Sequence, residues 1–192
     1  MKNTIKTITL ATITTIALTA CGGGGGDSTP GYTAHPYDAP GISEADKNAY
    51  LSAVNNARSV GRSCGALGWY DATAPLTWND GLYRAAYEHS QDMDATDYYE
   101  HEGSGTASDW TAQVQELGRG SYFGERTQNN NAPQAILQAE NIAADYTSIN
   151  SVMNAWLASD GHCSSIMDGS TIEFGMARVG NYWTQEFSGE RL

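Results

Sequence analysis

The three cysteines and four histidines are the residues of this 192-residue chain best suited to chemistry. Cys21 lies near the N-terminus, so Cys64 and Cys163 are the pair left in the body of the chain. In an oxidising compartment the default state of such a pair is a disulfide. It would close a loop of about a hundred residues and contribute up to roughly 4–5 kcal/mol through chain entropy. The alternative is a nucleophilic thiol at Cys163 beside His162, although adjacent side chains rarely point at each other.

Histidines and carboxylates could support two further kinds of chemistry. Two neutral imidazoles can bind a divalent metal, zinc most readily, and a metal with an open coordination position could activate water. Without a metal, a histidine paired with a carboxylate could act as a general base. The spacing alone matches no known zinc motif, because the chain has no His-Glu-x-x-His. Asp92, Asp94 and Asp97 lack the glycine and the glutamate of an EF-hand loop, so we interpret them as a solvated helix face.

The N-terminal segment predicts export. Two lysines are followed by an uncharged, largely apolar run over residues 7–20, which is too short to span a bilayer but suits a signal peptide. The sequence Leu-Thr-Ala-Cys at residues 18–21 is similar to a bacterial lipobox, whose cysteine is acylated. We therefore predict a lipoprotein signal peptide over residues 1–20 and a membrane anchor of acyl chains on Cys21. The alternative is an ordinary secretory signal with a chance cysteine.

The residues after Cys21 predict a tether and then one domain. A glycine run at residues 22–26 and several prolines give residues 21–42 little to bury, so we expect a flexible tether there. Gly22, rather than an aspartate, follows the cysteine, which favours sorting to the outer membrane. Residues 43–192 have the length of a single domain.

The charge of the chain argues against a nucleic-acid partner. The formal charge is −12, and removing the two lysines of the signal peptide would take it to −14. Binding to a phosphate backbone needs clustered lysine and arginine. The basic residues of the body of the chain are instead scattered, and include Arg58, Arg62, Arg84, Arg119, Arg126 and Arg178. The acidity therefore indicates solubility rather than a nucleic-acid or anionic-lipid surface.

Capping residues and apolar periodicity predict several helices followed by a β-hairpin. The expected helices run from Ser43 to Gly61, from Asn79 or Asp80 through Met93, from Asp109 to Gly118, from Ala135 to Ala143, and from Ser148 through Trp156. Strand-like runs at residues 174–179 and 182–187 are joined by a Gly-Asn turn. His89 falls on the apolar face of its helix, so we expect a core histidine with a hydrogen-bond partner. This order of elements predicts an α+β or layered α-β-α architecture.

Six phrases in order together resemble the bacterial branch of the CAP superfamily, which groups cysteine-rich secretory proteins, antigen-five venom allergens and plant pathogenesis-related proteins. They lie at residues 55–58, 75–79, 89–93, 140–143, 156–163 and 182–185. The resemblance runs from about Leu51 to Phe187. It implies a three-layer α-β-α sandwich with a central antiparallel sheet, and it supports a link between Cys64 and Cys163.

The resemblance also implies a shallow cleft lined by two histidines and two acidic residues. His101, Glu140 and His162 match three of these positions. The second glutamate of the family pattern is replaced here by Ser159, and Glu173 is a candidate to serve in its place. His101 and His162 would then be the ligands of a weakly bound zinc or other divalent metal. Alternatively, Glu140 is simply a buried acid that bonds backbone amides.

Three classes of function stay open from the sequence. The leading hypothesis is a binding module that holds a lipid, a glycan or an envelope protein, because the chain has an anchor and a tether but no complete catalytic motif. The second is a hydrolase acting on peptides or esters through a metal or His/Glu chemistry. The third is a structural envelope protein whose cleft residues are merely inherited. Family resemblance alone does not decide among them.

Overall fold

The computed structural model of the protein describes residues 33–132 and 138–189. The predicted signal peptide, the predicted lipidation site Cys21 and the first part of the predicted tether lie outside the described residues. So do residues 133–137 and 190–192. Within the described part of the chain, no helix combines the length and the apolar character needed to cross a membrane.

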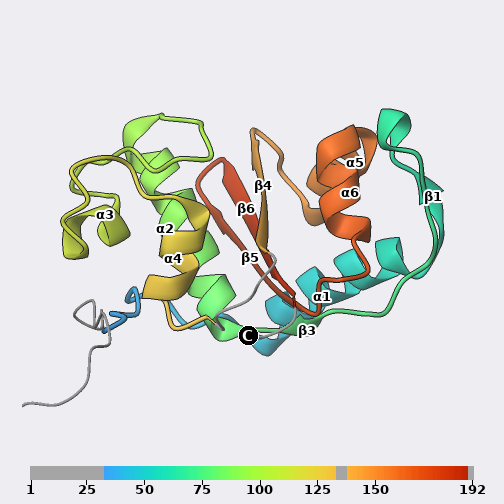
Figure 1. Cartoon of the computed structure of the whole chain (residues 1–192), viewed down its shortest axis with the longest axis horizontal. Helices are drawn as coiled ribbons and strands as arrows, with labels where there is room; N and C mark the ends of the chain where they lie inside the picture. The colour runs from blue at the N-terminus through green and yellow to red at the C-terminus, as the bar shows by residue number, and fades with distance from the viewer. Residues whose placement is uncertain (1–32, 133–137, 190–192) are drawn as a thin grey trace, which may run out of the picture. The chain divides into compact units, whose positions relative to one another are not determined.

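A four-stranded sheet lies between two layers of helices, which confirms the predicted α-β-α arrangement (Figure 1). The helices are α1 (Glu44–Arg58), α2 (Asp80–Thr96), α3 (Trp110–Val114), α4 (Phe123–Asn129), α5 (Ile149–Ala158) and α6 (Asp160–Met167), with a 3-10 turn η1 (Gly65–Leu67). The strands are β1 (Arg62–Ser63), β2 (Trp69–Tyr70), β3 (Thr77–Trp78), β4 (Gln138–Ala144), β5 (Glu173–Val179) and β6 (Tyr182–Ser188). Helix α2 covers one face of the sheet, and α1, α5 and α6 cover the other.

The sheet has the strand order β3-β5-β6-β4, so β4 lies at one edge. Strands β4, β6 and β5 are antiparallel, as predicted, whereas the short β3 runs parallel to β5. A separate two-stranded ribbon is formed by β1 and β2. The predicted hairpin is confirmed: Val179 pairs with Tyr182 across the Gly180-Asn181 turn, where Gly180 has a φ of 52°.

Four of the five predicted helix starts are confirmed, and in each of the four a side chain caps the first turn of its own helix. Ser43 accepts a hydrogen bond from the Asp46 amide, and Asn79 accepts two at the start of α2. Asp109 and Ser148 do the same for α3 and α5. Such caps satisfy amides that have no partner inside the helix. These local signals need no tertiary context, which is why the sequence reveals them.

The predicted helix from Ala135 to Ala143 is wrong where the structure describes it. Residues 138–144 form β4, which pairs with β6 along its whole length. Residues 135–137 lie outside the described residues. The segment is rich in Ala, Gln and Glu, which favour a helix locally, but pairing with a neighbouring strand overrides this weak preference.

Gly175 on β5 sets the distance between α2 and the sheet. A Cβ atom there would lie 2.2 Å from the Tyr83 amide nitrogen and 2.4 Å from the Leu82 carbonyl carbon. Both neighbours are backbone atoms of α2, so they cannot move aside as a side chain could. On the other face of the sheet, the core contains Trp156, Phe174 and other fully buried side chains.

We expect Gly175→Ala to lower the free energy of unfolding by about 1–3 kcal/mol, because the added methyl pushes α2 off the sheet. Urea denaturation followed by tryptophan fluorescence measures the change. Gly161→Ala is the matched control, since a Cβ at Gly161 meets nothing within 4 Å. Equal stability of the two variants would contradict this account of the close approach.

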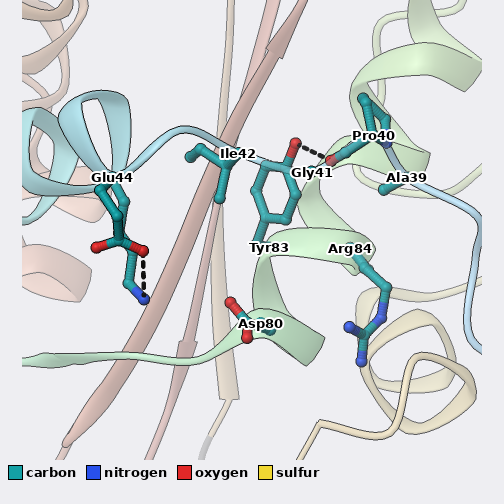
Figure 2. A pocket seen from close by; sticks show the side chains of 9 residues that line it. Ala39, Pro40, Gly41, Ile42, Glu44, Asp80, Tyr83 and Arg84 are labelled. Atoms are coloured by element: carbon teal, nitrogen blue, oxygen red, sulfur yellow. Dashed lines mark hydrogen bonds and ion pairs between the residues drawn. The ribbon is translucent and has the colours of Figure 1, made fainter.

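The last part of the predicted tether is docked on the domain. The backbone amide of His35 donates to Asn129 Oδ1 at 3.2 Å, and that of Tyr37 donates to Asn130 Oδ1 at 2.6 Å. Tyr83 donates its hydroxyl hydrogen to the Pro40 carbonyl at 2.9 Å (Figure 2). Residues 33–42 therefore belong to the folded domain rather than to the tether predicted over residues 21–42, and the tether remains a prediction for residues 21–32.

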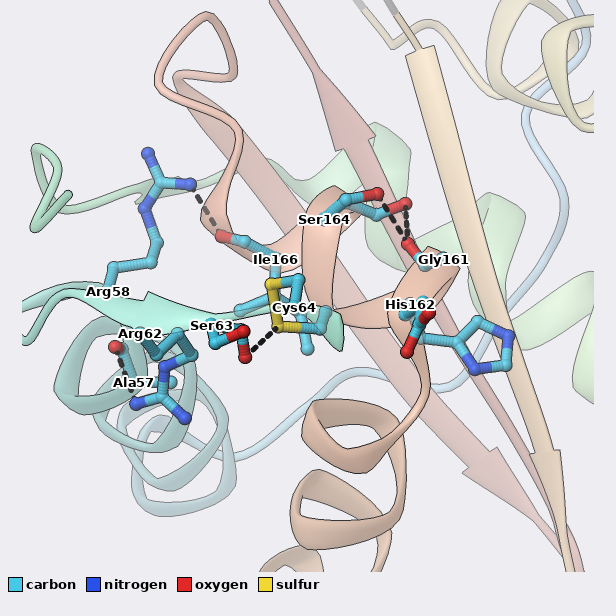
Figure 3. Close-up of a disulfide and its surroundings, with 12 residues drawn as sticks. Ala57, Arg58, Arg62, Ser63, Cys64, Gly161, His162, Ser164 and Ile166 are labelled. Carbon is cyan, nitrogen blue, oxygen red and sulfur yellow. Dashed lines mark hydrogen bonds between the residues drawn. A yellow bond between two sulfur atoms is a disulfide. The ribbon is translucent and has the colours of Figure 1, made fainter. Parts of the chain in front are cut away.

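Cys64 and Cys163 form a disulfide, with 5.4 Å between their Cα atoms and a separation of 99 positions in sequence. It joins the start of η1 to α6, so Cys163 is not a nucleophilic thiol. In Figure 3 the His162 imidazole extends away from the disulfide, toward the strand at the sheet edge. Arg58 reinforces this region by donating Nη1 to the Ile166 carbonyl at 2.7 Å.

Removing the disulfide by the double substitution C64A/C163A is expected to lower the free energy of unfolding by about 2–5 kcal/mol, because it frees a long loop in the unfolded chain. Chemical denaturation of the oxidised protein and the variant measures the difference. The reduced wild-type protein serves as a second reference and should resemble the variant. Two titratable thiols in the native protein would refute the bond.

Candidate functional site

Glu140 on β4 is the centre of the candidate site. Its carboxylate accepts a hydrogen bond from His101 Nδ1 at Oε1, 2.9 Å away, and from Arg126 Nη2 at Oε2, 2.7 Å away. Burial alone would raise the pKa of Glu140, but Arg126, followed by His89 and the bond from His101, holds that pKa well below its usual range. Glu140 is therefore ionised, and it is bonded by two side chains rather than by backbone amides as the alternative interpretation expected.

Arg126 on α4 fixes both Glu140 and the loop that carries His101. Its guanidinium is buried and donates to the Ser121 carbonyl at 2.6 Å and to the His101 carbonyl at 3.0 Å. The loop is further held by Asp92, which accepts from the Ser104 amide at 2.7 Å. Asp92 is 2 % exposed, so it is a buried loop anchor and not part of a solvated helix face as predicted.

The His101 imidazole combines exposure with a fixed orientation. Its side chain is 54 % exposed, while its Nδ1 donates to the buried Glu140 carboxylate. The hydrogen bond to Glu140 is the main reason why the pKa of His101 is raised, and partial burial opposes it. Because Nδ1 is engaged, Nε2 is the ring nitrogen that would meet a ligand.

His162 approaches the same strand from the other helical layer. It lies on α6, and its backbone carbonyl accepts a hydrogen bond from Asn141 Nδ2 on β4 at 3.3 Å. Its imidazole is partly buried, and both burial and the nearby charge of His101 lower its pKa. The two imidazoles thus flank β4 and interact electrostatically, with His162 neutral at neutral pH.

Glu173 is not brought to the histidines. Its carboxylate bonds Asn79 Nδ2 and Ser188 Oγ, each at 3.3 Å, at the end of the sheet near β3. In the strand register Glu173 lies opposite Ser188 on β6, whereas Glu140 lies opposite Glu186 on the other side of β6. Two strand spacings, together with an offset of two residues along the strand, place the backbones of Glu173 and Glu140 roughly 12 Å apart. The acid that accompanies Glu140 is Glu186.

Glu186 is a buried acid that the sequence reasoning missed. Its carboxyl shares a hydrogen bond with the Glu140 carboxylate, and among the described residues no amide or hydroxyl donor reaches either of its oxygens. Burial and the negative charge of Glu140 raise the pKa of Glu186 well above its usual value, so it stays protonated beside the ionised Glu140. The sequence did contain a signal for Glu186. Side chains alternate between the two faces of a strand, so the predicted strand places this acid on a sheet face that a helix must cover.

Two more titratable side chains lie in the same buried layer of α2. His89 places Nε2 3.0 Å from the Glu100 carbonyl, and burial lowers its pKa to about 4, which confirms the predicted neutral core histidine. Glu88 accepts hydrogen bonds from the Thr111 amide at 2.6 Å and from Asn130 Nδ2 at 2.7 Å. Burial nonetheless raises the pKa of Glu88 to about 7.

The side chains of the site do not complete a tight metal centre. The described ranges contain no group of three or more His, Cys, Asp or Glu side chains that could hold a metal ion. Both Glu140 oxygens already bond His101 and Arg126, so a zinc ion would have only Nε2 of His101 and the imidazole of His162 as protein ligands. Catalytic zinc sites use three protein ligands, so these residues fall short of one.

We expect Glu140→Gln to lower the pKa of His101, because the variant removes the negative charge that favours the imidazolium. A pH titration of the imidazole signals by NMR measures this, with Glu100→Gln, the weaker of the two acidic neighbours, giving a smaller drop. The raised pKa also means that this contact stabilises the fold most below pH 6.5, and that the contribution is lost as the pH rises through the folded-state pKa.

An unchanged pKa of His101 in Glu140→Gln would show that the contact does not set its protonation. The variant also removes the counter-ion of a buried arginine and could unfold the protein. Glu140→Asp then provides the test, because it keeps the charge near Arg126 and withdraws it from His101. A lower pKa of His101 in Glu140→Asp than in the wild type would support the assignment as well as the result in Glu140→Gln would.

Comparison with known proteins agrees with this fold. The family model described as "CAP: Cysteine-rich secretory protein family" matches residues 51–187. An SCP-domain extracellular protein from Bacillus anthracis is 23 % identical with a TM-score of 0.52, over 62 % of this chain and 35 % of that one. An outer surface protein from Borrelia burgdorferi is 18 % identical with a TM-score of 0.56, over 83 % of this chain and 100 % of that one.

These likenesses concern the fold. The chain spans about a third of the Bacillus anthracis protein, 35 % of its length, so the remainder of that protein has no counterpart in the match. No curated protein shows a significant sequence match to the chain.

Proposed function

This chain belongs to the cysteine-rich secretory protein family, and on that premise we propose that it is an exported envelope protein that binds a ligand or partner at the site of His101, Glu140 and His162. The lipobox-like sequence ending at Cys21 supports export and a lipid anchor. The two similar structures are described as an extracellular protein and an outer surface protein, which is in keeping with export.

The orientation of His101 carries this proposal. A half-exposed imidazole is held by a buried ion pair between Glu140 and Arg126, and the same arginine holds the backbone of His101. A buried ion pair contributes little to stability compared with apolar packing, because removing two charges from water costs several kcal/mol per ion. Such a pair is better explained by the surface group that it orients, here the Nε2 side of His101.

The geometry favours binding over hydrolysis. A histidine oriented by a carboxylate is the arrangement of a general base, so His101 and Glu140 could accept a proton from a substrate or from water. The thiol considered as a nucleophile is in the disulfide, and the second acid, Glu186, is buried and protonated. Catalysis by this pair would therefore need a reacting group supplied by the ligand. For a purely structural protein, an exposed and oriented imidazole would serve no purpose.

The ligand classes that we propose are a lipid, a glycan or another protein of the envelope. Nucleic acid is not among them, because the chain is acidic at a formal −12. A zinc or other divalent ion could join at His101 and His162, weakly, since it would have only two protein ligands.

We expect one class of envelope component to shift the His101 imidazole signal in NMR titrations of the purified protein. Separate titrations use soluble glycan fragments, phospholipid vesicles and short peptides, with zinc in parallel. His101→Ala should weaken the saturable binding about tenfold, the loss of one hydrogen bond to a charged or polar group. His35→Ala, another exposed histidine, is the control and should bind normally.

Binding that is equally strong in His101→Ala and wild type would place the ligand elsewhere and overturn the proposed site. Absence of binding by every class, with all proteins folded, would favour the structural role. Zinc binding that survives removal of either histidine would refute the two-imidazole metal site.

A further inference from the structure

A cavity of about 200 Å³ lies beside His162, along the outer edge of β4. It opens between the loop that follows α2, which carries Tyr99, and the end of α5. The aromatic and polar side chains of its lining are Tyr99, Tyr146, Trp156, Ser159 and His162. Because His162 lines the cavity and Tyr99 is two residues before His101, the cavity adjoins the site already described.

Two aromatic walls of the cavity are fixed by one backbone group. The Tyr99 hydroxyl donates to the Ile142 carbonyl at 3.2 Å, and Trp156 Nε1 donates to the same carbonyl at 2.9 Å. Tyr99 also packs against Tyr182, with 6.2 Å between ring centroids. The Tyr99 side chain is nevertheless 45 % exposed. An exposed ring that is held in place offers a flat apolar face at little cost in conformational freedom.

The polar lining of the cavity contains no carboxylate, ammonium or guanidinium group. It comprises the hydroxyls of Tyr99, Tyr146 and Ser159 and the His162 imidazole, and the residues that line the cavity include no Asp, Glu, Lys or Arg. The His162 imidazole adds two ring nitrogens that can form hydrogen bonds. A charged ligand group would find no counter-charge here, whereas a ring with several hydroxyls would find donors and acceptors.

The size of the cavity limits what enters it. Pockets for drug-sized ligands measure roughly 300–1,000 Å³, so a cavity of about 200 Å³ holds one ring-sized group. The hydroxyls and the imidazole among its lining suit an acyl chain poorly. Since the cavity adjoins His101, a larger ligand could place one unit in it and the next unit beside that imidazole.

We propose that this cavity is a subsite for one neutral sugar ring of a glycan that continues past His101. The proposal rests on the proposed function and selects the glycan among its ligand classes. The apolar face of the sugar ring packs on Tyr99, and its hydroxyls meet Ser159 and His162.

Calorimetric titration of the purified protein with oligosaccharides of N-acetylglucosamine and of glucose tests the proposal, with oligosaccharides of galacturonic acid as an acidic series. We expect saturable binding of a neutral series, and weaker binding of the acidic series, which has no cation to meet. Tyr99→Ala should weaken the binding of the neutral sugar about tenfold. Tyr98→Ala is the matched control, because Tyr98 is 44 % exposed and is not among the lining residues.

The outcomes separate this proposal from the proposed function. If no neutral series binds, or if Tyr99→Ala binds as well as Tyr98→Ala, the sugar subsite is overturned. In that case a lipid or peptide that shifts the His101 signal would still support the proposed function. If sugar binding depends on Tyr99 and is unaffected by His101→Ala, the subsite stands and the binding role of His101 fails. Preference for the acidic series would refute a neutral ligand.

Discussion

The buried ion pair of Arg126 and Glu140 is the interaction on which the candidate site depends. Both side chains are 1 % exposed, and together they join α4, β4 and the loop of His101. Removing one partner of such a pair costs about 3–5 kcal/mol, because the other charge stays buried without compensation. The pair lies beside two further buried carboxyl groups, those of Glu186 and Glu88, whose protonation differs from that of Glu140. Burial raises the pKa of Glu88 toward neutrality, and burial together with the charge of Glu140 keeps Glu186 protonated, because the single buried arginine offsets only part of these effects.

The edge position of β4 explains how residues from opposite helical layers reach one site. An interior strand would have a neighbour on each side, and that neighbour would separate the α2 layer from the α6 layer. At the edge, His101 and His162 can flank the strand, and Tyr99 and Trp156 can both bond the outward carbonyl of Ile142. Those two bonds also cover part of an edge that could otherwise pair with another chain. The side chains that protect the strand edge are thus also those that we propose to contact the ligand.

What the sequence predicts well is local. Ser43, Asn79 and Ser148 start helices through contacts within three residues, and the Gly-Asn turn fixes the terminal hairpin. The disulfide was predictable because the two cysteines of a domain predicted to be exported allow only one pairing within it. The candidate site was found in part, through a family resemblance rather than through spacing. Arg126 and Glu186 escaped because their partner, Glu140, is separated from them by 14 and 46 positions, and no short motif records such a contact.

If the domain is anchored through Cys21 as proposed, the docking of residues 33–42 limits how far it can reach from the membrane. An extended chain spans at most about 3.5 Å per residue, so a tether over residues 21–42 would reach about 75 Å from an acylated Cys21. With Tyr37 and its neighbours fixed to the domain, only residues 21–32 remain, and they reach about 40 Å at most. The domain would then stay within a thin layer next to the bilayer surface. Its ligand would have to be present in that layer rather than far from the membrane.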